Sequence, residues 1–215
     1  MQPTFSIGRR HLGPGQPVYV IAELSGNHNQ RYDEAVELVK AAKAAGADAV
    51  KLQTYTPETM TIQCDNEHFR IGQGTIWAGK NLYDLYGEAH TPWAWQPKLM
   101  RVAERLGLDL FSTAFDPTSL AFLEEMGVPL HKVASFEIVD LPLVRQVAAT
   151  GKPLIVSTGM ASLCEVERAV AAARQAGGGP LALLKCTSAY PAPPEEMYLR
   201  TLPHLAGTFG VPVGM

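Results

Sequence analysis

Strand-like and helix-like segments alternate along nearly the whole chain, and this alternation restricts the possible folds more than any other feature. Each short apolar run is followed by a polar turn, a segment with helical periodicity, and a Gly or Pro. The pattern predicts strands at Val18–Glu23, Ala49–Gln53, Asp109–Thr113, His131–Ala134, Leu154–Ser157, Leu181–Lys185 and Val211–Gly214. It predicts helices at Tyr32–Ala45, Trp95–Arg105, Pro117–Glu125, Leu141–Ala148, Leu163–Gln175 and Glu195–Leu205. Strict alternation favours parallel strands with helices packed outside them.

The first predicted helix shows how its sequence specifies it. Ala35, Leu38, Val39 and Ala42 are spaced at i, i+3, i+4 and i+7, which places them on one apolar stripe. Gly46 follows the last helical turn and suits a helix stop.

Seven such strands predict an α/β fold, a (β/α)8 TIM barrel that is incomplete at its C-terminus, in one domain over residues 1–215. A doubly wound sheet is the alternative, but Glu23–His28 is not its glycine-rich phosphate turn. At the N-terminus, Phe5–Ile7 and Val18–Val20 flank Gly13–Gly15 and predict a hairpin. The segment Thr56–Pro92 is too long for an ordinary connection and follows the end of a strand, where barrel active sites form.

Polar side chains gather where the predicted strands end. They are Glu23, Lys51, Gln53, Ser112, Thr113, Lys132, Ser135, Glu137, Ser157, Thr158, Lys185, Thr187 and Ser188. Strand parity puts Lys51 and Gln53 on one face, whereas Lys132 and Ser135 converge only if the chain bends between them.

Three lysines in apolar strands favour an anion site, because a buried ammonium is costly without a partner. Neighbouring hydroxyls complete a cradle for phosphate and carboxylate oxygens, and Glu23 and Glu137 are candidates for proton transfer or sugar contacts. Simpler interpretations remain open. Any one lysine can be a surface residue, Glu23 can form an internal ion pair with Lys51, and His28 can cap the following helix. Tyr190 and the three tryptophans can be loop core.

Composition narrows the function classes. The formal net charge is −3, which gives no general attraction to nucleic acid or anionic membrane. We expect no membrane span and no signal peptide, because no apolar run is long enough and residues 1–10 are interrupted by Pro, Ser, Gly and Arg. Cys64, Cys164 and Cys186 lack metal-type spacing, so a reduced, cytoplasmic setting is expected.

Six blocks in register resemble the sialic acid (nonulosonate) synthase family. They are Ile21–Asn29, Gly46–Gln53, Phe111–Asp116, Lys132–Glu137, Val156–Met160 and Cys186–Pro191, and they span nearly the whole chain. Within the family, Thr75–Tyr86 and Thr91–Trp93 of the long insertion are similar to the pseudaminic acid branch. Lys185 also resembles that branch, because acetylneuraminate synthases carry a metal-binding histidine there.

The resemblance implies a reaction between phosphoenolpyruvate and the open-chain aldehyde of a 2,4-diacetamido-2,4,6-trideoxy hexose, giving pseudaminic acid and phosphate. A divalent metal, Mn or Mg, is implied as cofactor. By motif position, phosphoenolpyruvate would contact Lys51, Gln53, Thr113, Lys132, Ser135, Ser157, Lys185 and Thr187. Glu23 and Glu137 would be catalytic, and sugar contacts would fall at Asn27, His28 and Tyr190.

Family members are longer, with an eighth barrel unit and an antifreeze-like C-terminal domain that reaches a partner subunit in a homodimer. Neither is present in residues 1–215, and no metal ligands are assigned. We therefore expect this stretch alone to be weakly stable and inactive, because the first and seventh strands lack partners. Measurable turnover by the purified chain would contradict that expectation.

Four alternatives remain at this stage. An N-acetylneuraminate or legionaminate synthase would use the same residues on a different sugar. An aldolase making deoxy-octulosonate phosphates would need more basic residues for a phosphorylated sugar. A catalytically inactive sugar-binding fragment would bind phosphoenolpyruvate weakly or not at all.

Overall fold

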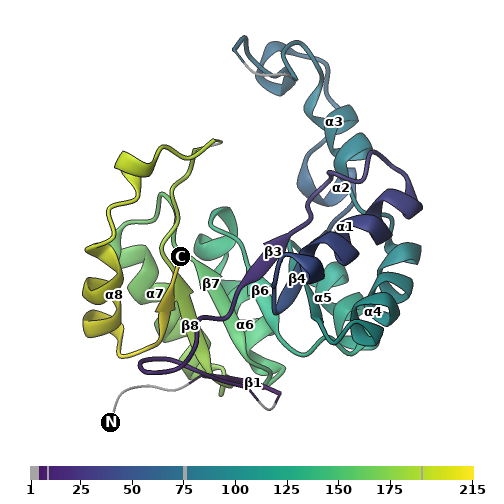
Figure 1. Cartoon of the computed structure of the whole chain (residues 1–215). Helices are drawn as coiled ribbons and strands as arrows, with labels where there is room; N and C mark the ends of the chain where they lie inside the picture. Colours follow the sequence, from purple (N-terminus) through teal and green to yellow (C-terminus); the bar gives the residue numbers. More distant parts are fainter. Residues whose placement is uncertain (1–4, 9, 75–76, 190) are drawn as a thin grey trace. The chain divides into compact units, whose positions relative to one another are not determined.

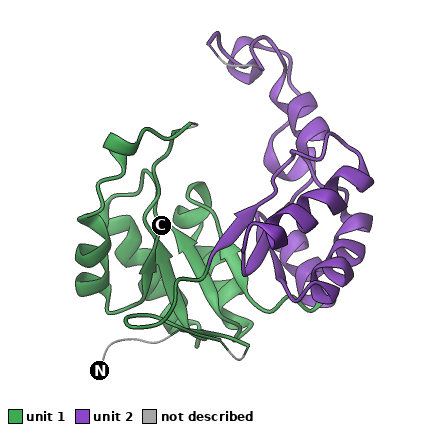
Figure 2. Cartoon of the chain, in the orientation of Figure 1, with its two compact units in different colours: residues 1–19, 127–215 green, residues 20–126 purple. Residues whose placement is uncertain are grey.

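The protein is described by a computed structural model that covers residues 5–8, 10–74, 77–189 and 191–215. The chain divides into two compact units, shown in different colours in Figure 2. Unit 1 comprises Met1–Tyr19 and Gly127–Met215, and unit 2 comprises Val20–Met126.

Unit 2 contains three parallel strands and the helices that connect them (Figure 1). The strands are β3 (Ile21–Glu23), β4 (Ala49–Thr54) and β5 (Asp109–Ala114), with β4 between the other two. The helices are α1 (Tyr32–Ala44), α4 (Gln96–Arg105) and α5 (Pro117–Met126). The apolar stripe of α1 packs on β4 and α4 as the sequence predicts, and Ala35, Val39 and Ala42 are buried in the shared core.

The long insertion of unit 2 forms short helices after β4. They are α2 (Pro57–Met60), the 3-10 helix η1 (Glu67–Phe69), α3 (Leu82–Ala89) and the 3-10 helix η2 (Trp93–Trp95). None of the described residues of α2, η1 and α3 is buried, so this segment adds no core of its own. Residues 75–76 of the block that resembles the pseudaminic acid branch lie outside the described residues.

Unit 1 contains four parallel strands. In order they are β6 (His131–Val133), β7 (Leu154–Ser157), β8 (Leu181–Leu184) and β9 (Val213–Gly214). The connections are the 3-10 helix η3 (Phe136–Val139), α6 (Leu141–Ala149), α7 (Leu163–Gln175), the 3-10 helix η4 (Pro194–Glu196) and α8 (Thr201–Phe209). All four residues of β7 are buried, because helices and neighbouring strands cover both faces of a parallel strand.

The predicted fold class is confirmed. Seven parallel strands with intervening helices form a partial (β/α)8 barrel, accompanied by an antiparallel hairpin at the N-terminus. The C-terminal ends of the strands are the ends at which such folds build their active sites.

The predicted partner within the hairpin is wrong. Phe5–Ile7 (β1) pairs with Arg10–Leu12 (β2), with Phe5 opposite Leu12, and Val18–Val20 is not a strand. Gly8 follows the first strand and has φ of +54°, a conformation that glycine adopts without strain. The segment Gly13–Gly15 follows the second strand and does not connect the two.

Helix ends follow the sequence except at the last helix. Gly46 follows α1 with φ of +88°, and glycines 107, 127, 151 and 177 follow α4, α5, α6 and α7 with φ between +66° and +75°. The last helix was predicted at Glu195–Leu205 but lies at Thr201–Phe209. Tyr198 has φ of +42°, which a helix does not allow, so Pro194–Glu196 forms a separate 3-10 turn.

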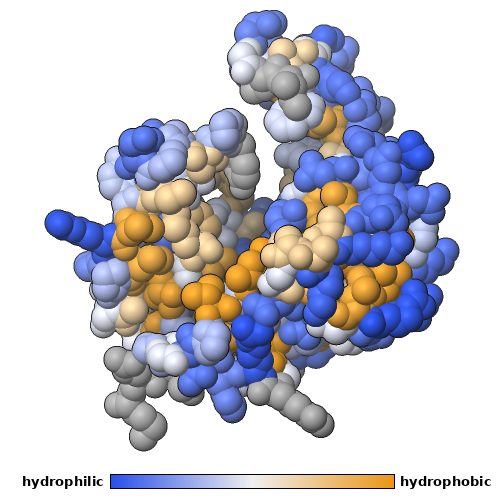
Figure 3. Space-filling model, in the orientation of Figure 1, coloured by the Kyte–Doolittle hydropathy of each residue, from blue (hydrophilic) through white to orange (hydrophobic). Residues whose placement is uncertain are grey.

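Hydrophilic residues cover much of the visible face of unit 2, with apolar residues exposed between them (Figure 3). No helix within the described ranges has the length and apolar character required to cross a bilayer.

Candidate functional site

In unit 2, three predicted site residues meet at the ends of neighbouring strands. The parallel pairing of β3 with β4 sets Glu23 opposite Lys51, and the Glu23 carboxylate forms an ion pair with the Lys51 ammonium. Lys51 Nζ also donates a hydrogen bond to Thr113 Oγ1 on β5, at 3.3 Å. The ion pair that offered a simpler interpretation of Glu23 is therefore present.

Gln53 lies on the same face of β4 as Lys51, as strand parity predicts. Its Nε2 donates to Ser25 Oγ at 3.4 Å. Ser25 in turn donates from its backbone N–H and its hydroxyl to Glu23 Oε1, both at 3.1 Å. Both carboxylate oxygens of Glu23 are therefore held, one by Ser25 and the other by Lys51. Ser25 was not predicted as a site residue, although its place two residues after Glu23 allows such a turn.

In unit 1, Lys132 is the most buried of the predicted lysines. Its side chain is 4% exposed, and Nζ donates to Ser157 Oγ at 2.6 Å and to the Val133 carbonyl oxygen at 2.7 Å. Burial lowers the pKa of Lys132 to about 8, and the electrostatic influence of Cys186 and Glu137 opposes this change. The described hydrogen-bond acceptors of this amine are neutral oxygens, which leaves it able to gain from a bound anion.

The chain bends after β6. Such a bend is what Lys132 and Ser135 require if their side chains, which have opposite strand parity, are to converge. Ser135 has helical φ and ψ and starts η3, so its side chain turns toward β7. Its Oγ accepts a hydrogen bond from the backbone N–H of Gly159 at 3.1 Å. Ser135 therefore joins the loop that follows Ser157.

Glu137 lies in η3 beside this cluster. Among the described residues, its Oε2 is buried and has no hydrogen-bond partner. Burial raises the pKa of Glu137, while the Lys132 charge acts in the opposite direction. A raised pKa keeps a carboxyl group protonated to higher pH than an ordinary glutamate, which suits a proton donor.

Gly159 marks a narrow space between two hydroxyl groups. A Cβ atom at this position would lie 2.6 Å from Ser188 Oγ and 2.8 Å from Ser135 Oγ. Glycine therefore leaves room between the Ser135 and Ser188 hydroxyls, and hydroxyl groups can donate to phosphate oxygens.

Lys185 follows the end of β8 and is engaged separately from Lys132. It is 7% exposed, and its Nζ donates to Thr187 Oγ1 at 2.8 Å and to the Glu196 carbonyl oxygen at 3.3 Å. The ammonium also lies 5.8 Å from the centre of the Tyr198 ring. Thr187 is thus close to Lys185, as expected, but both are bonded to the segment that follows the strand.

Two predicted sugar contacts, Asn27 and His28, have partners inside the protein. Asn27 Nδ2 donates to the Leu24 carbonyl oxygen at 3.1 Å. His28 is 1% exposed, and both of its ring nitrogens are hydrogen bonded, to Gln30 N and to Thr91 Oγ1. The third, Tyr190, lies outside the described residues. Trp93 and Trp95 pack against other rings and are loop core.

The described residues do not by themselves form a metal centre. No group of three His, Cys, Asp or Glu side chains in the described ranges is placed to hold an ion. The sequence resemblance places Lys185 at the position of a metal-binding histidine, but its ammonium is a donor that cannot ligate while charged. The described residues therefore do not fit the implied metal.

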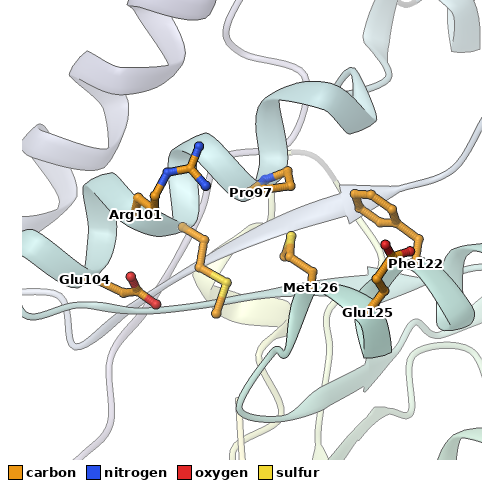
Figure 4. Close-up of a pocket in the computed structure, with 7 residues that line it drawn as sticks. Pro97, Arg101, Glu104, Phe122, Glu125 and Met126 are labelled. Atoms are coloured by element: carbon orange, nitrogen blue, oxygen red, sulfur yellow. The ribbon is translucent and has the colours of Figure 1, made fainter.

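A surface pocket of about 400 Å³ lies away from the strand ends, between α4 and α5 (Figure 4). Pro97, Arg101 and Glu104 line it from α4, and Phe122, Glu125 and Met126 line it from α5. None of the predicted site residues contributes to it.

Comparison with known proteins bears on the fold and on the family. Residues 38–215 match the model of the NeuB family. The chain is 44% identical over 200 residues to a pseudaminic acid synthase of Helicobacter pylori, covering 93% of this chain. It is 35% identical over 211 residues to an N,N'-diacetyllegionaminic acid synthase of Legionella pneumophila, covering 96% of this chain.

A solved structure agrees with the fold. An N-acetylneuraminic acid synthetase of Leptospira borgpetersenii, in complex with citrate, superposes with a TM-score of 0.86 and 28% identity. That match covers 100% of this chain and 70% of the Leptospira chain. The chain spans 58% of the length of the Helicobacter relative and 59% of the Legionella relative. Since the family model covers most of the sequence, the resemblance seen in the six sequence blocks is confirmed, and the chain belongs to the NeuB family.

Proposed function

We propose that the protein containing this chain is a nonulosonate synthase that condenses phosphoenolpyruvate with the open-chain aldehyde of an amino sugar. The observation that carries the proposal is the buried amine of Lys132, which is bonded to Ser157 and lies beside the Ser135–Gly159 contact. A phosphate or carboxylate group there would satisfy an ammonium whose hydrogen-bond acceptors, among the described residues, are neutral oxygens.

The proposed reaction forms one carbon–carbon bond, bonds the oxygen of water to carbon 2 of phosphoenolpyruvate, and breaks the bond between carbon 2 and the phosphate oxygen. Carbon 3 of phosphoenolpyruvate attacks the aldehyde carbon, whose oxygen takes up a proton. Water adds at carbon 2 and loses a proton, and inorganic phosphate leaves from the same carbon. Lys132, Ser135 and Ser157 hold the phosphoenolpyruvate, and Glu137 exchanges the proton near the reacting carbons.

The Glu23–Lys51–Thr113 cluster supplies the remaining polar groups in this proposal. Gln53 and Ser25 hold Glu23 in a fixed orientation toward the sugar or the attacking water. Lys51 and Thr113 contact phosphoenolpyruvate from their strands. A common pocket that joins these residues to Lys132, Glu137 and Lys185 stays a prediction.

For the sugar, we propose a 2,4-diacetamido-2,4,6-trideoxy hexose and hence pseudaminic acid as product. The Helicobacter relative is a pseudaminic acid synthase, and the insertion resembles that branch. Legionaminic acid is the second candidate, because the Legionella relative shares 35% of aligned positions. Homodimer formation and cytoplasmic location of the full-length protein are further expectations.

The test uses the full-length gene product with phosphoenolpyruvate and each of three sugars. These are the pseudaminic precursor, its legionaminic stereoisomer and N-acetylmannosamine, with phosphate release and product mass as readouts. We expect the highest kcat/KM with the pseudaminic precursor and loss of at least 100-fold in Lys132→Met. Lys40→Met, an exposed lysine on α1, is the matched control and should change activity less than 2-fold.

Two outcomes would count against the proposal at different levels. Faster turnover of another sugar would overturn the pseudaminic assignment alone. No phosphate release with any of the three sugars would overturn the synthase proposal and favour an inactive sugar-binding protein or an aldolase acting on phosphorylated sugars.

A further inference from the structure

A chain of buried polar side chains connects the first loop of unit 2 to both ends of the insertion. His28 Nε2 contacts Thr91 Oγ1 at 3.1 Å, and the Thr91 carbonyl oxygen accepts from Gln96 Nε2 at 3.4 Å. Gln96 Oε1 accepts from Thr54 Oγ1 at 2.8 Å, and Thr54 shares a 2.6 Å hydrogen bond with Ser112 Oγ. All five residues are 0–1% exposed. We call this set the stem network, because Thr54 precedes the insertion and Thr91 ends it.

The tautomer of His28 follows from its two partners. Nδ1 accepts a hydrogen bond from the backbone N–H of Gln30 at 3.2 Å, so the ring proton is on Nε2 and is donated to Thr91. Burial and then His90 lower the pKa of His28, whereas Glu34 raises it. The neutral imidazole is therefore the form that the stem network uses near pH 7.

The loop held by His28 has a strained backbone. Ser25, Asn29 and Gln30 have φ values of +46°, +50° and +55°, which non-glycine residues seldom adopt. Three such residues within six positions persist only where surrounding contacts fix them, and such strain is concentrated at functional sites.

Two further contacts press this loop onto the end of α3. A Cβ atom at Gly26 would lie 2.6 Å from the Ala89 carbonyl oxygen, so the two backbones approach as closely as a glycine allows. Gln30 Nε2 donates to the carbonyl oxygens of Glu88 at 2.8 Å and His90 at 2.6 Å. The last turn of α3 and the first loop thus form one clamped unit.

The clamped loop carries Ser25, which holds the Glu23 carboxylate by two hydrogen bonds. Continuous contacts therefore lead from the insertion through His28 and the strained turn to Glu23 and Lys51. Displacement of the loop would move Ser25 and release one oxygen of the Glu23 carboxylate.

We propose that His28 is a positioning residue, which uses the stem network to lock the first loop to the insertion and so fixes Glu23 on the sugar side of the site. The proposal rests on the proposed synthase function for its catalytic consequence. It differs from the sequence-based expectation that His28 contacts sugar, because the ring is buried and both nitrogens are occupied by protein groups.

The first test needs no substrate and uses the full-length protein. Hydrogen exchange is measured over residues 82–91 in wild type, His28→Ala and His28→Gln, where glutamine can replace the Nε2 donor. We expect exchange at least 10-fold faster in His28→Ala, near-wild-type exchange in His28→Gln, and no change in His204→Ala, which alters an exposed histidine of α8. Unchanged exchange in His28→Ala would overturn the lock whatever reaction the protein catalyses.

The second test uses the full-length enzyme. Loss of positioning on the sugar side should lower kcat/KM for the sugar at least 10-fold in His28→Ala, while KM for phosphoenolpyruvate changes less than 2-fold. His28→Gln should recover activity to within about 3-fold of wild type. Equal losses for both substrates, or no recovery by glutamine, would contradict the proposal.

A folding defect does not prevent the test. If His28→Ala does not fold, Thr91→Val removes the hydroxyl acceptor at nearly constant volume and should give the same one-sided loss for the sugar. A Thr91→Val enzyme with wild-type kinetics for both substrates would overturn the proposal. Inactivity of the wild-type enzyme with every sugar would refute the proposed function but leave the exchange experiment intact.

Discussion

The buried amine of Lys132 leads to a quantitative prediction about protons. Its pKa is lowered to about 8 from the ordinary value of 10.5 because the side chain is taken out of water. Binding of a dianion holds the amine in its charged form, so binding must take up a proton wherever the free site is partly neutral. With a pKa of about 8, uptake should be about 0.2 proton at pH 7.5 and about 0.9 proton at pH 9.

The same change in pKa affects stability in a defined direction. Between pH 8 and 10.5 the unfolded chain keeps the Lys132 proton and the folded chain releases it, so the unfolded state binds more protons. Stability relative to a variant without this amine therefore rises with pH across that window. The full effect is about 3 kcal/mol, from about 1.4 kcal/mol for each unit of pKa.

Isothermal calorimetry measures the proton uptake directly. Phosphoenolpyruvate is titrated into the full-length protein, and in parallel into the 215-residue chain, in two buffers of different ionisation enthalpy at each pH. Lys132→Met should bind at least 100-fold more weakly and lose the pH-dependent uptake, whereas the surface control Lys40→Met should retain both. Uptake that does not change between pH 7.5 and pH 9 would refute the reasoning, since it would mean that the amine is already fully charged in the free site.

Two glycine substitutions give further predictions, each compared with Gly72→Ala, where an added Cβ meets nothing within 4 Å. In Gly159→Ala the new methyl group would lie 2.8 Å from Ser135 Oγ, so calorimetry should show at least 10-fold weaker phosphoenolpyruvate binding with an unchanged circular dichroism spectrum. In Gly26→Ala the clash with the Ala89 carbonyl oxygen should lower the free energy of unfolding in urea by about 1–3 kcal/mol. Wild-type binding in the first variant, or wild-type stability in the second, would show that these sites can relax.

The sequence predicted those parts of the fold that depend on local pattern. Helical periodicity placed α1 within one residue of its observed end, and the parity of β4 placed Lys51 and Gln53 on one face. The second strand of the hairpin and the bounds of the last helix were wrong, because single backbone conformations decided them. Gly8 turns the chain before the glycine-rich segment, and Tyr198 interrupts what reads as one continuous helix.

The residue types of the candidate site could be predicted from the sequence, but several of their contacts could not. The lysine–hydroxyl pairs at strand ends were visible in the sequence, because parallel strands bring their C-terminal ends to one side. The partners of His28 were not visible, since Thr91 lies 63 residues away and follows an insertion with no strand or helix pattern that sets its end. From the sequence alone, a histidine that follows a strand is interpreted as a ligand contact. Its burial and its hydrogen-bond partners, which only the structure shows, change that interpretation.

The two lysine clusters differ in what they offer an incoming anion. Lys51 is already paired with the Glu23 carboxylate, so an anion that approaches it must compete with an existing ion pair or add to a nearly neutral group. Lys132 is more deeply buried and its amine is hydrogen bonded to neutral oxygens, so a bound phosphate removes a desolvation cost that the free protein carries. The gain from binding an anion is therefore larger at Lys132. The neutral Glu23–Lys51 pair, held by Ser25 and the stem network, is better suited to an uncharged aldehyde and its hydroxyl groups. On the proposed function, this difference in charge gives a physical reason why Lys132 binds the phosphate group while Glu23 orients the sugar.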